Sequence, residues 1–251
     1  MEPEQYEVLL RREDGHWWYA GMRRAALALL RSAQPAGSAA RILDAGCGTG
    51  GTTIRLREFG PAVFGVDYAA AALTPAAARG LAGDLAQGSV ERLPFRDASF
   101  DLVTSFEVIY HAGVASDSQA LREFHRVLRP GGLLLLRLPA HDWLRGRHDR
   151  LVHTRRRYSR AEVRDKLRAA GFRVERLSWA NGLLFPPAAA KRLLERLSSE
   201  QEGEGGAEPD LWQPPRALNW LLEQCVALEA LLLPRRLPIP FGLSVIALAR
   251  A

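Results

Sequence analysis

Short apolar runs alternate with helical patterns along most of this chain, and this alternation restricts it to few folds. Runs of strand length occupy 42–45, 62–67, 85–90, 100–107, 133–138, 172–179 and 243–249. Amphipathic spacing typical of helices fills 52–59, 69–79, 118–128 and 160–170 between them. Strands that alternate with helices predict an α/β fold, in which a mostly parallel sheet carries helices on both faces.

The composition fits one large globular unit. The chain has 251 residues, of which 47% are apolar, so a well-filled core is expected. Two cysteines, Cys47 and Cys225, are too few for a disulfide framework, and we expect no metal site. No run approaches the roughly 20 apolar residues that span a bilayer. The first residues are polar and acidic, unlike a secretory signal, so a cytoplasmic setting is expected.

The positive charge is a weak indicator of a partner. The net charge is +6 and the sequence pI is about 9.9, values that nucleic-acid and anionic-lipid binders share. However, Lys166 and Lys191 are the lysines of the chain, and alanine tracts accompany the many arginines. This bias is typical of a GC-rich bacterial genome. Nucleic acid is therefore not a favoured partner.

The pattern divides the chain into three parts. We predict a helical cap or lid at 1–34, a main domain at 35–180 and 240–251, and a helical insertion at 181–239. The insertion carries helices at 186–197 and 215–233, and its acidic, glycine-rich stretch 198–210 is predicted to be a mobile loop. Its apolar stripes favour packing on the main domain. A cover over a binding site, a homodimer contact in place of a monomer, or peripheral membrane contact are alternatives.

The stretch from Asp44 to Gly51 (DAGCGTGG) carries the most chemical information. It follows a strand and precedes a helix, so its glycines let backbone amides approach a ligand. Gly46-x-Gly48-x-x-Gly51 is also a formal dinucleotide fingerprint. Asp67 ends the second strand, where a carboxylate accepts hydrogen bonds from ribose hydroxyls. Asp44 would repel a pyrophosphate and attract an ammonium group. A nucleoside with an amino-acid end therefore fits better than NAD.

These residues resemble the class I S-adenosylmethionine-dependent methyltransferases. The acidic-x-Gly-x-Gly-x-Gly motif of that family matches Asp44, Gly46, Gly48 and Gly50, and its ribose-binding acid matches Asp67. Its Leu-Pro-Phe…Ser-Phe-Asp-Leu-Val segment corresponds to 93–103, and Arg-Val-Leu-Arg-Pro-Gly-Gly to 126–132. The resemblance covers 41–179 and the last strand. It is to the type 11-like members, here with an N-terminal His-Trp-Trp-Tyr cap.

The resemblance implies a Rossmann-like fold with a seven-stranded sheet, and S-adenosylmethionine as cofactor with S-adenosylhomocysteine as product. It further implies contacts with this cofactor from the ends of the second to fourth strands, by Tyr68, Ser89, Val90 and Phe106. Many relatives have an aspartate after the third strand that holds the adenine amino group, where this chain has Ser89. That contact is the one departure from the family pattern.

The segment after the fourth strand is where the family exposes groups to the methyl donor. His111 is our first choice for a general base, because an unperturbed imidazole titrates near pH 6.5. Tyr110 or Glu107 would orient His111 or the substrate. In the alternative interpretation, His111 only packs or hydrogen-bonds to the methionine end of the cofactor.

Four residues of the N-terminal motif, His16-Trp17-Trp18-Tyr19, are too aromatic for an ordinary helix face. We predict that Trp17 and Tyr19 close over the cofactor and that His16 and Trp18 contact the acceptor. In the alternative interpretation, these residues anchor the N-terminal helices to the sheet.

The long connection after the fifth strand supplies further candidates for acceptor contact. They are His141, His148, Arg156 and Tyr158. An arginine there suits an acidic group of the acceptor, although a solvated basic loop is an equal alternative. The histidine spacing matches no zinc signature.

The sequence thus predicts methyl transfer to an oxygen or nitrogen atom of a small acceptor, such as a secondary metabolite or a sugar- or lipid-linked molecule. The alternatives are a methyltransferase that acts on nucleic acid or protein, and a non-catalytic nucleoside-binding relative. An NAD-dependent oxidoreductase is least favoured, because Asp44 opposes a pyrophosphate.

Overall fold

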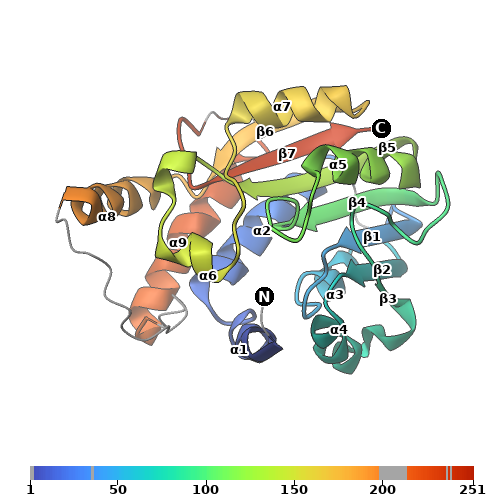
Figure 1. Cartoon of the computed structure of the whole chain (residues 1–251), viewed down its shortest axis with the longest axis horizontal. Coiled ribbons are helices and arrows are strands. Elements are labelled where there is room, and N and C mark those ends of the chain that lie inside the picture. The colour runs from blue at the N-terminus through green and yellow to red at the C-terminus, as the bar shows by residue number, and fades with distance from the viewer. Residues whose placement is uncertain (1–2, 35–36, 198–213, 236, 238) are drawn as a thin grey trace.

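A computed structural model describes residues 3–34, 37–197, 214–235, 237 and 239–251. Its centre is a seven-stranded sheet in the order β3-β2-β1-β4-β5-β7-β6 (Figure 1). The strands are β1 (Arg41–Ala45), β2 (Ala62–Asp67), β3 (Leu85–Gln87), β4 (Phe100–Phe106), β5 (Leu128–Pro139), β6 (Arg173–Ala180) and β7 (Ser244–Arg250). The predicted α/β fold is confirmed.

The strand order creates a crevice above one edge of the sheet. β1 pairs in parallel with both β2 and β4, and β4 pairs in parallel with β5. The chain leaves β1 toward β2 and later returns to β4 on the other side of β1. The connections that follow β1 and β4 therefore diverge, and α/β folds bind ligands at such switch points. Among the strands of the described residues, β7 alone runs antiparallel to its neighbours, β5 and β6.

Helices cover both faces of the sheet (Figure 1). On one face, α5 (Asp117–Val127) and α7 (Arg160–Ala169) contact each other and the strands β5, β6 and β7. On the other, α2 (Trp17–Arg31) packs along α9 (Arg216–Leu232). The remaining α-helices are α1 (Pro3–Arg12), α3 (Thr53–Leu56), α4 (Ala70–Ala76), α6 (Arg147–Leu151) and α8 (Phe185–Leu197).

The core includes the second N-terminal helix. β5 is buried on both faces over 133–136, as its continuous leucine run predicts. Met22, Ala25, Ala26 and Leu30 of α2 are 0% exposed, so one whole side of this helix lies inside the molecule. Burial of a large apolar side chain contributes about 1.5–3 kcal/mol. Because of these contacts α2 is part of the folded core, whereas α1 contacts α4 at the surface.

Two helices and one strand are shorter than the sequence predicts. α3 covers 53–56 of the expected 52–59, and α4 ends at Ala76, where a π turn (Ala77–Leu81) and a 3-10 turn (Ala82–Asp84) follow. Pro75 lacks an amide hydrogen, and Gly80 has a φ of +84°, so regular helix cannot continue through this stretch. β3 stops at Gln87 because the chain turns at 88–92.

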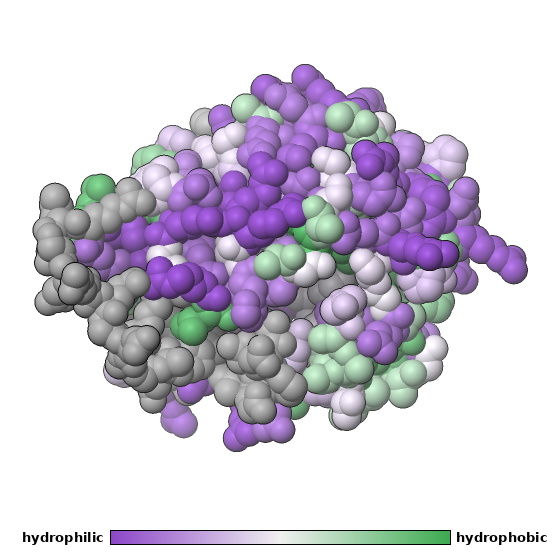
Figure 2. All heavy atoms as spheres, in the orientation of Figure 1, coloured by the Kyte–Doolittle hydropathy of each residue, from purple (hydrophilic) through white to green (hydrophobic). Residues whose placement is uncertain are grey.

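The segment between β6 and β7 carries α8 and α9, as its periodicity predicts. The expected loop at 198–210 lies outside the described residues. The face shown in Figure 2 is mostly hydrophilic over α5 and α7, and weakly hydrophobic residues gather over the alanine-rich α4. Among the helices of the described chain, we find none that is long and apolar enough to cross a membrane.

Candidate functional site

The turn after β1 contains glycines with different roles. Gly46, Gly48 and Gly50 all have positive φ angles, which favour glycine. A Cβ atom at Gly46 would lie 2.2 Å from Val108 Cγ2, so this glycine is required by packing. A Cβ at Gly48 would have no heavy atom within 4 Å. The middle of the turn therefore borders open space at the crevice.

The amide groups of this turn point into the protein. Gly46 N and Cys47 N donate to Val66 O at 2.7 and 3.0 Å, and Gly48 N donates to Asp67 Oδ2 at 2.9 Å. A pyrophosphate is normally held by free amides of such a turn and by the helix that follows it. Here those three amides are occupied and α3 is a single turn, so the turn does not suit a dinucleotide.

Asp67 is held in place by backbone groups. Its Oδ1 accepts from Ala69 N at 3.0 Å, and its Oδ2 accepts the bond from Gly48. Each carboxylate oxygen has a second lone pair, which leaves capacity for a ribose diol. Burial raises the pKa of Asp67, and the backbone hydrogen bonds from Ala69, Gly48 and Tyr68 oppose that shift.

Tyr6 of α1 lies close to Asp67, and the sequence patterns did not indicate this. Burial raises the pKa of Tyr6 to about 12, and the charge of Asp67 adds to the shift. The side chain is half-buried between α1 and the end of β2. In the sequence Tyr6 and Leu9 have helical spacing, which indicates packing and not a binding site.

Asp44 lies beneath the turn. It is 2% exposed, and its oxygens accept from Thr53 Oγ1 at 2.7 Å and Thr104 Oγ1 at 2.8 Å. Burial raises its pKa to about 6, although both hydroxyl bonds lower it. Asp44 therefore ties the turn to α3 and β4.

Glu13 joins the N-terminal helices to the same turn. Its Oε1 accepts from Thr49 Oγ1 at 2.6 Å and from Arg79 Nη2 at 2.8 Å. A Cβ atom at Gly51 would lie 2.3 Å from Glu13 Oε2, so the absence of a side chain there admits the carboxylate. The aromatic residues that follow Glu13 drew the sequence interpretation away from it.

His16 and Trp17 have structural contacts at the start of α2. His16 is the N-cap, with Nδ1 accepting from Trp18 N at 3.3 Å, and is 8% exposed. Trp17 N donates to Asn219 Oδ1 at 3.0 Å, and Asn219 Nδ2 donates to Gly15 O at 2.9 Å. The cap turn is thus clamped to α9, and the predicted acceptor contact of His16 does not follow from this geometry.

A buried ion pair lies where β4 and β5 end. Arg137 donates from Nε to Glu107 Oε1 at 3.0 Å, and it is 6% exposed. The guanidinium carbon is 5.3 Å from the ring centres of both Trp18 and Phe106. Glu107 has a φ of +58°, which is unusual for a residue other than glycine and is concentrated at functional sites.

His111 stands at the rim of this region. Its Nδ1 accepts from Gly113 N at 2.9 Å, and its ring meets that of His153 edge to face at 5.8 Å. Burial lowers the pKa of His111, so the imidazole is neutral near pH 7. With Nδ1 as acceptor, the neutral ring carries its proton on Nε2. A base role requires the Gly113 bond to open.

Tyr110 and Tyr19 lie near the same ion pair. Burial raises the pKa of Tyr110 far above its usual range, and the nearby charge of Glu107 adds to the shift. Burial also raises the pKa of Tyr19 to about 12. Both phenols therefore stay protonated at neutral pH.

The cofactor contacts predicted at the ends of the second and third strands lie beyond β2 and β3. Tyr68 is 75% exposed directly after Asp67. Ser89 Oγ accepts from Glu91 N at 3.1 Å, and Val90 is 6% exposed. The Ser89 hydroxyl stabilises the turn at 89–91 and retains its own hydrogen for donation.

Two predicted acceptor residues lie elsewhere. Tyr158 is 1% exposed and donates to Asp117 Oδ2 at 2.9 Å. Arg156 pairs with Asp117 and with Glu162. Both hold the start of α7 against α5, so we omit them from the proposed site.

His141 and His148 follow β5. The His141 ring stacks on Trp179 with a centroid distance of 4.5 Å and hydrogen-bonds to the Gly242 backbone. Its Nε2 is buried without a partner among the described residues. His148 belongs to α6, and its side chain lies outside the described residues.

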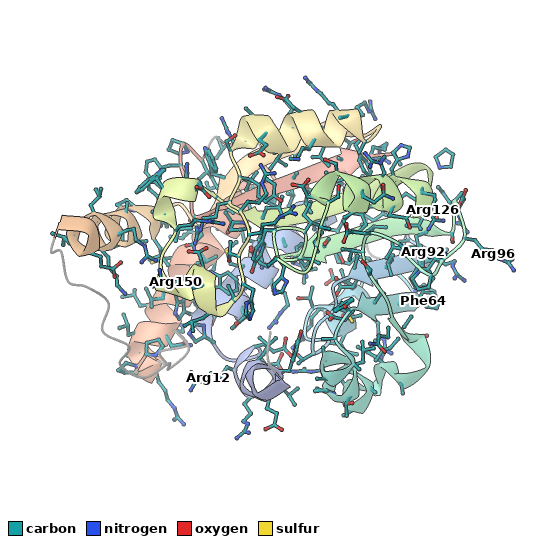
Figure 3. All side chains as sticks on the ribbon, viewed as in Figure 1. Arg12, Phe64, Arg92, Arg96, Arg126 and Arg150 are labelled. Atoms are coloured by element: carbon teal, nitrogen blue, oxygen red, sulfur yellow. The ribbon has the colours of Figure 1, made fainter. Side chains whose placement is uncertain are left out.

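Two family motifs lie away from the crevice. Arg126 donates to Glu123 and Asp97 and to the carbonyls of Leu93 and Phe95. Figure 3 shows Arg126 with Phe64, Arg92 and Arg96 on the right, and Arg12 and Arg150 on the left. Arg126 thus fastens the 93–97 segment to α5, so these two motifs stabilise the fold and do not contribute to the crevice.

The residues present fit S-adenosylmethionine. Asp67 retains acceptor capacity for the ribose, Gly48 faces open space, and the occupied amides of the turn disfavour a phosphate. Within the part of the chain that the structure describes, no group of three His, Cys, Asp or Glu side chains is placed to hold a metal ion.

Comparisons with known proteins agree with this geometry. Residues 43–136 match the family model described as a methyltransferase domain. A probable S-adenosylmethionine-dependent methyltransferase of Mycolicibacterium smegmatis is 37% identical over 137 residues, which cover 53% of this chain and 52% of that protein. A malonyl-[acyl-carrier protein] O-methyltransferase of Enterobacter lignolyticus is 38% identical over 122 residues, 49% of this chain and 47% of that protein. The chain spans about half the length of the curated relatives it matches.

The fold likeness extends over nearly the whole chain. An S-adenosylmethionine-dependent methyltransferase structure from Mesorhizobium loti superposes with a TM-score of 0.57 and 18% identity, covering 95% of this chain and 100% of that one. At this identity the likeness concerns the fold alone. The stretch 43–136 is thus a methyltransferase domain, and the motifs placed around its crevice match those of the class I S-adenosylmethionine-dependent methyltransferases.

Proposed function

We propose that the protein transfers a methyl group from S-adenosylmethionine to an oxygen or nitrogen atom of a small-molecule acceptor. The observation that carries this proposal is the arrangement of Asp67 and Gly48, a fixed carboxylate beside open space at the switch point of the sheet. S-adenosylmethionine supplies an electrophilic methyl group on a sulfonium centre. The protein has to bind the cofactor and the acceptor, orient the acceptor atom toward the methyl group, and accept the proton that this atom loses.

In this proposal the cofactor lies across the ends of β1, β2 and β4. Asp67 holds the ribose, the turn from 46 to 50 supports the amino-acid end, and Tyr68, Ser89 and Val90 border the base. Phe106 and Tyr19 lie on the side toward β5. Glu13 fixes the turn through Thr49, so the N-terminal helices complete the site.

Two groups are candidates for the proton acceptor. His111 is neutral near pH 7, as a general base must be. Glu107 directly follows β4, four residues before His111. Burial raises the pKa of Glu107, which brings it closer to the pKa range that suits a general base. Trp18 and His141 border the acceptor side in this proposal.

Relatives support a small or carrier-linked acceptor. Two of them are named as a malonyl-[acyl-carrier protein] O-methyltransferase and a demethylmenaquinone methyltransferase. We propose a cytoplasmic enzyme that acts as a monomer or homodimer. The parts at 1–34 and 181–239 are proposed to border the site, with α1 as the movable part of the cap.

The test is transfer of labelled methyl groups. The full chain is incubated with S-[methyl-¹⁴C]adenosylmethionine and a small-molecule extract that has been freed of protein and nucleic acid. We expect label in that fraction together with S-adenosylhomocysteine. Label that enters only added protein or nucleic acid would favour the alternative acceptors. Tight binding of S-adenosylhomocysteine without any transfer would favour a non-catalytic relative.

A further inference from the structure

Arg137 is a buried cation whose hydrogen-bonding capacity is only partly used. It is 6% exposed, and its Nε donates to Glu107. Its two Nη groups make no hydrogen bond to any residue that the structure describes. Neither Nη group is among the fully buried atoms that lack a partner, so both reach accessible space. A guanidinium with a free Nη edge is suited to bind a carboxylate.

The surroundings hold this guanidinium rigidly. Trp18 from α2 and Phe106 from β4 each lie 5.3 Å from its carbon, and Glu107 fixes the Nε edge. These contacts come from α2 and from the end of β4, so the orientation is fixed before a ligand arrives. Preorganised donors bind an anion with less loss of side-chain entropy.

The position of Arg137 in the sheet points to the acceptor. Arg137 pairs with Phe106 across β4 and β5, whereas the glycine turn follows β1 and Asp67 ends β2. Neighbouring strands are about 4.8 Å apart, so β5 lies roughly 10 Å beyond β1, on the side away from Asp67. Strands β1 and β4 lie between β5 and β2, so a group bound there is three strand spacings, about 14 Å, from the strand that ends at Asp67.

From this geometry we infer that Arg137 binds a carboxylate of the methyl acceptor, so that the enzyme selects acidic acceptors. The inference rests on the proposed methyl transfer. Trp18 and Phe106 flank the guanidinium, and apolar parts of the acceptor would lie along these rings. Glu107 holds the guanidinium by its Nε edge and is a positioning residue for this contact.

The experiment measures binding of benzoate to the complex with S-adenosylhomocysteine, with benzamide as the uncharged counterpart, by ligand-observed NMR. We expect wild type to bind benzoate more tightly than benzamide. Arg137→Gln should weaken benzoate binding at least tenfold and leave benzamide unchanged. Glu107→Gln keeps an acceptor for Nε and removes the competing charge, so it should strengthen benzoate binding severalfold.

The matched control is Arg41→Gln. Arg41 also stacks on two rings, Phe64 at 4.7 Å and Phe100 at 5.6 Å, but it begins β1 at the opposite edge of the sheet. The Arg41→Gln variant should bind benzoate as tightly as wild type. If Arg137→Gln fails to fold, the double variant Arg137→Gln/Glu107→Gln removes both charges and is measured in its place.

Two outcomes would overturn the inference. Equal benzoate binding by wild type and the Arg137 variants would remove the carboxylate site. If Arg137→Gln binds S-adenosylhomocysteine ten times more weakly than wild type but binds 5′-methylthioadenosine equally well, Arg137 holds the carboxylate of the cofactor and not that of the acceptor. Failure of wild type to bind S-adenosylhomocysteine contradicts the proposed function instead, and benzoate binding is then measured without it.

Discussion

At the scale of single residues, acidic side chains around the crevice have distinct roles that follow from their surroundings. Asp44 is enclosed and hydrogen-bonded to two threonine hydroxyls, whereas Asp67 receives backbone amides and keeps free lone pairs. Glu107 is paired with a cation, and Glu13 joins the cap to the turn. The same functional group thus supports the turn, binds the ribose in our proposal, or positions an arginine.

Asp44 makes the stability of the protein depend on pH. Its folded pKa of about 6 lies above its usual value of 3.8, so the folded state binds more protons and its stability falls as the pH rises from about 4 to 6. The loss from this group is at most about 3 kcal/mol. Asp44→Asn should remove this pH-dependent loss of stability, so the variant should gain stability relative to wild type as the pH rises from about 4 to 6.

The measurement is urea unfolding of both proteins between pH 4 and 7. The other raised carboxyls, those of Glu13, Asp67, Glu107 and Glu229, are present in both proteins. Glu107 and Glu229 cancel in the comparison, whereas the charges of Glu13 and Asp67 are part of the cause of the Asp44 shift. A difference in free energy of unfolding that stays constant with pH would contradict the raised pKa of Asp44.

His111→Ala tests the choice of base. If His111 accepts the proton, turnover should fall by roughly 10²–10⁴-fold, while S-adenosylhomocysteine binding stays the same. Because burial lowers the pKa of His111 below 6.5, wild-type turnover should lose activity only on the acid side of that value. The control is His125→Ala, since His125 of α5 packs on Phe172, away from the crevice. A loss smaller than tenfold would leave Glu107 as the candidate.

At the scale of elements, backbone hydrogen bonds fix how the helical insertion begins. Glu229 of α9 is 2% exposed and accepts from three successive amides, Asn181 N, Gly182 N and Leu183 N, at 2.6–3.0 Å. Asn181 has a φ of +60° directly after β6. The Glu229 carboxylate therefore fixes the backbone at 181–183, where β6 ends and the insertion begins, and joins this segment to α9.

Glu229→Ala should lower the free energy of unfolding by about 2–4 kcal/mol, because three buried amides lose their acceptor. For a chain of this size the melting temperature should fall by roughly 5–15 °C. Glu223→Ala on the same helix is the control, since Glu223 only pairs with the half-exposed Arg24 at 3.5 Å and should cost less than about 1 kcal/mol. Similar melting temperatures for both variants would contradict the role of Glu229. Differential scanning calorimetry gives the comparison.

At the scale of the whole molecule, the crevice is built from segments that are far apart in the sequence. The turn after β1, the end of β2, the exits of β4 and β5 and the N-terminal helices all contribute to it. A ligand that contacts these segments together should stabilise the entire fold, since each of them is fastened to the core.

We expect S-adenosylhomocysteine at 100 times its dissociation constant to stabilise the protein by about 2.7 kcal/mol, and to raise the melting temperature by roughly 5–10 °C. NAD at the same concentration should have no effect. Asp67→Ala should weaken cofactor binding by about 1–3 kcal/mol and reduce the shift, whereas the exposed Asp97→Asn should keep it. Equal shifts for wild type and the Asp67 variant, in thermal unfolding, would remove Asp67 from the proposed site.

Local sequence was sufficient for the number and order of the strands along the chain, for the glycine turn after β1 and for the place of Asp67 at the end of β2. Strand period and the need for glycine at positive φ are properties of neighbouring residues. The end of β3 was placed three residues too late. Local sequence was also sufficient for α8 and α9, whose periodicity is strong. It gave α3 and α4 too great a length, since Pro75 and Gly80 outweigh the helical spacing around them.

Only the tertiary structure decided which polar residues meet. Arg137 is one position in a leucine-rich strand, Tyr6 is part of a helical pattern, and Glu13 begins the aromatic N-terminal motif. Nothing local shows that the N-terminal helices lie against the glycine turn and β5. Tyr158 and Arg156 looked available, until Asp117 from another helix was found beside them. Burial and charge pairing depend on contacts between segments that are distant in the sequence. The hydrophobic period of a strand and the backbone freedom of a glycine depend only on neighbouring residues.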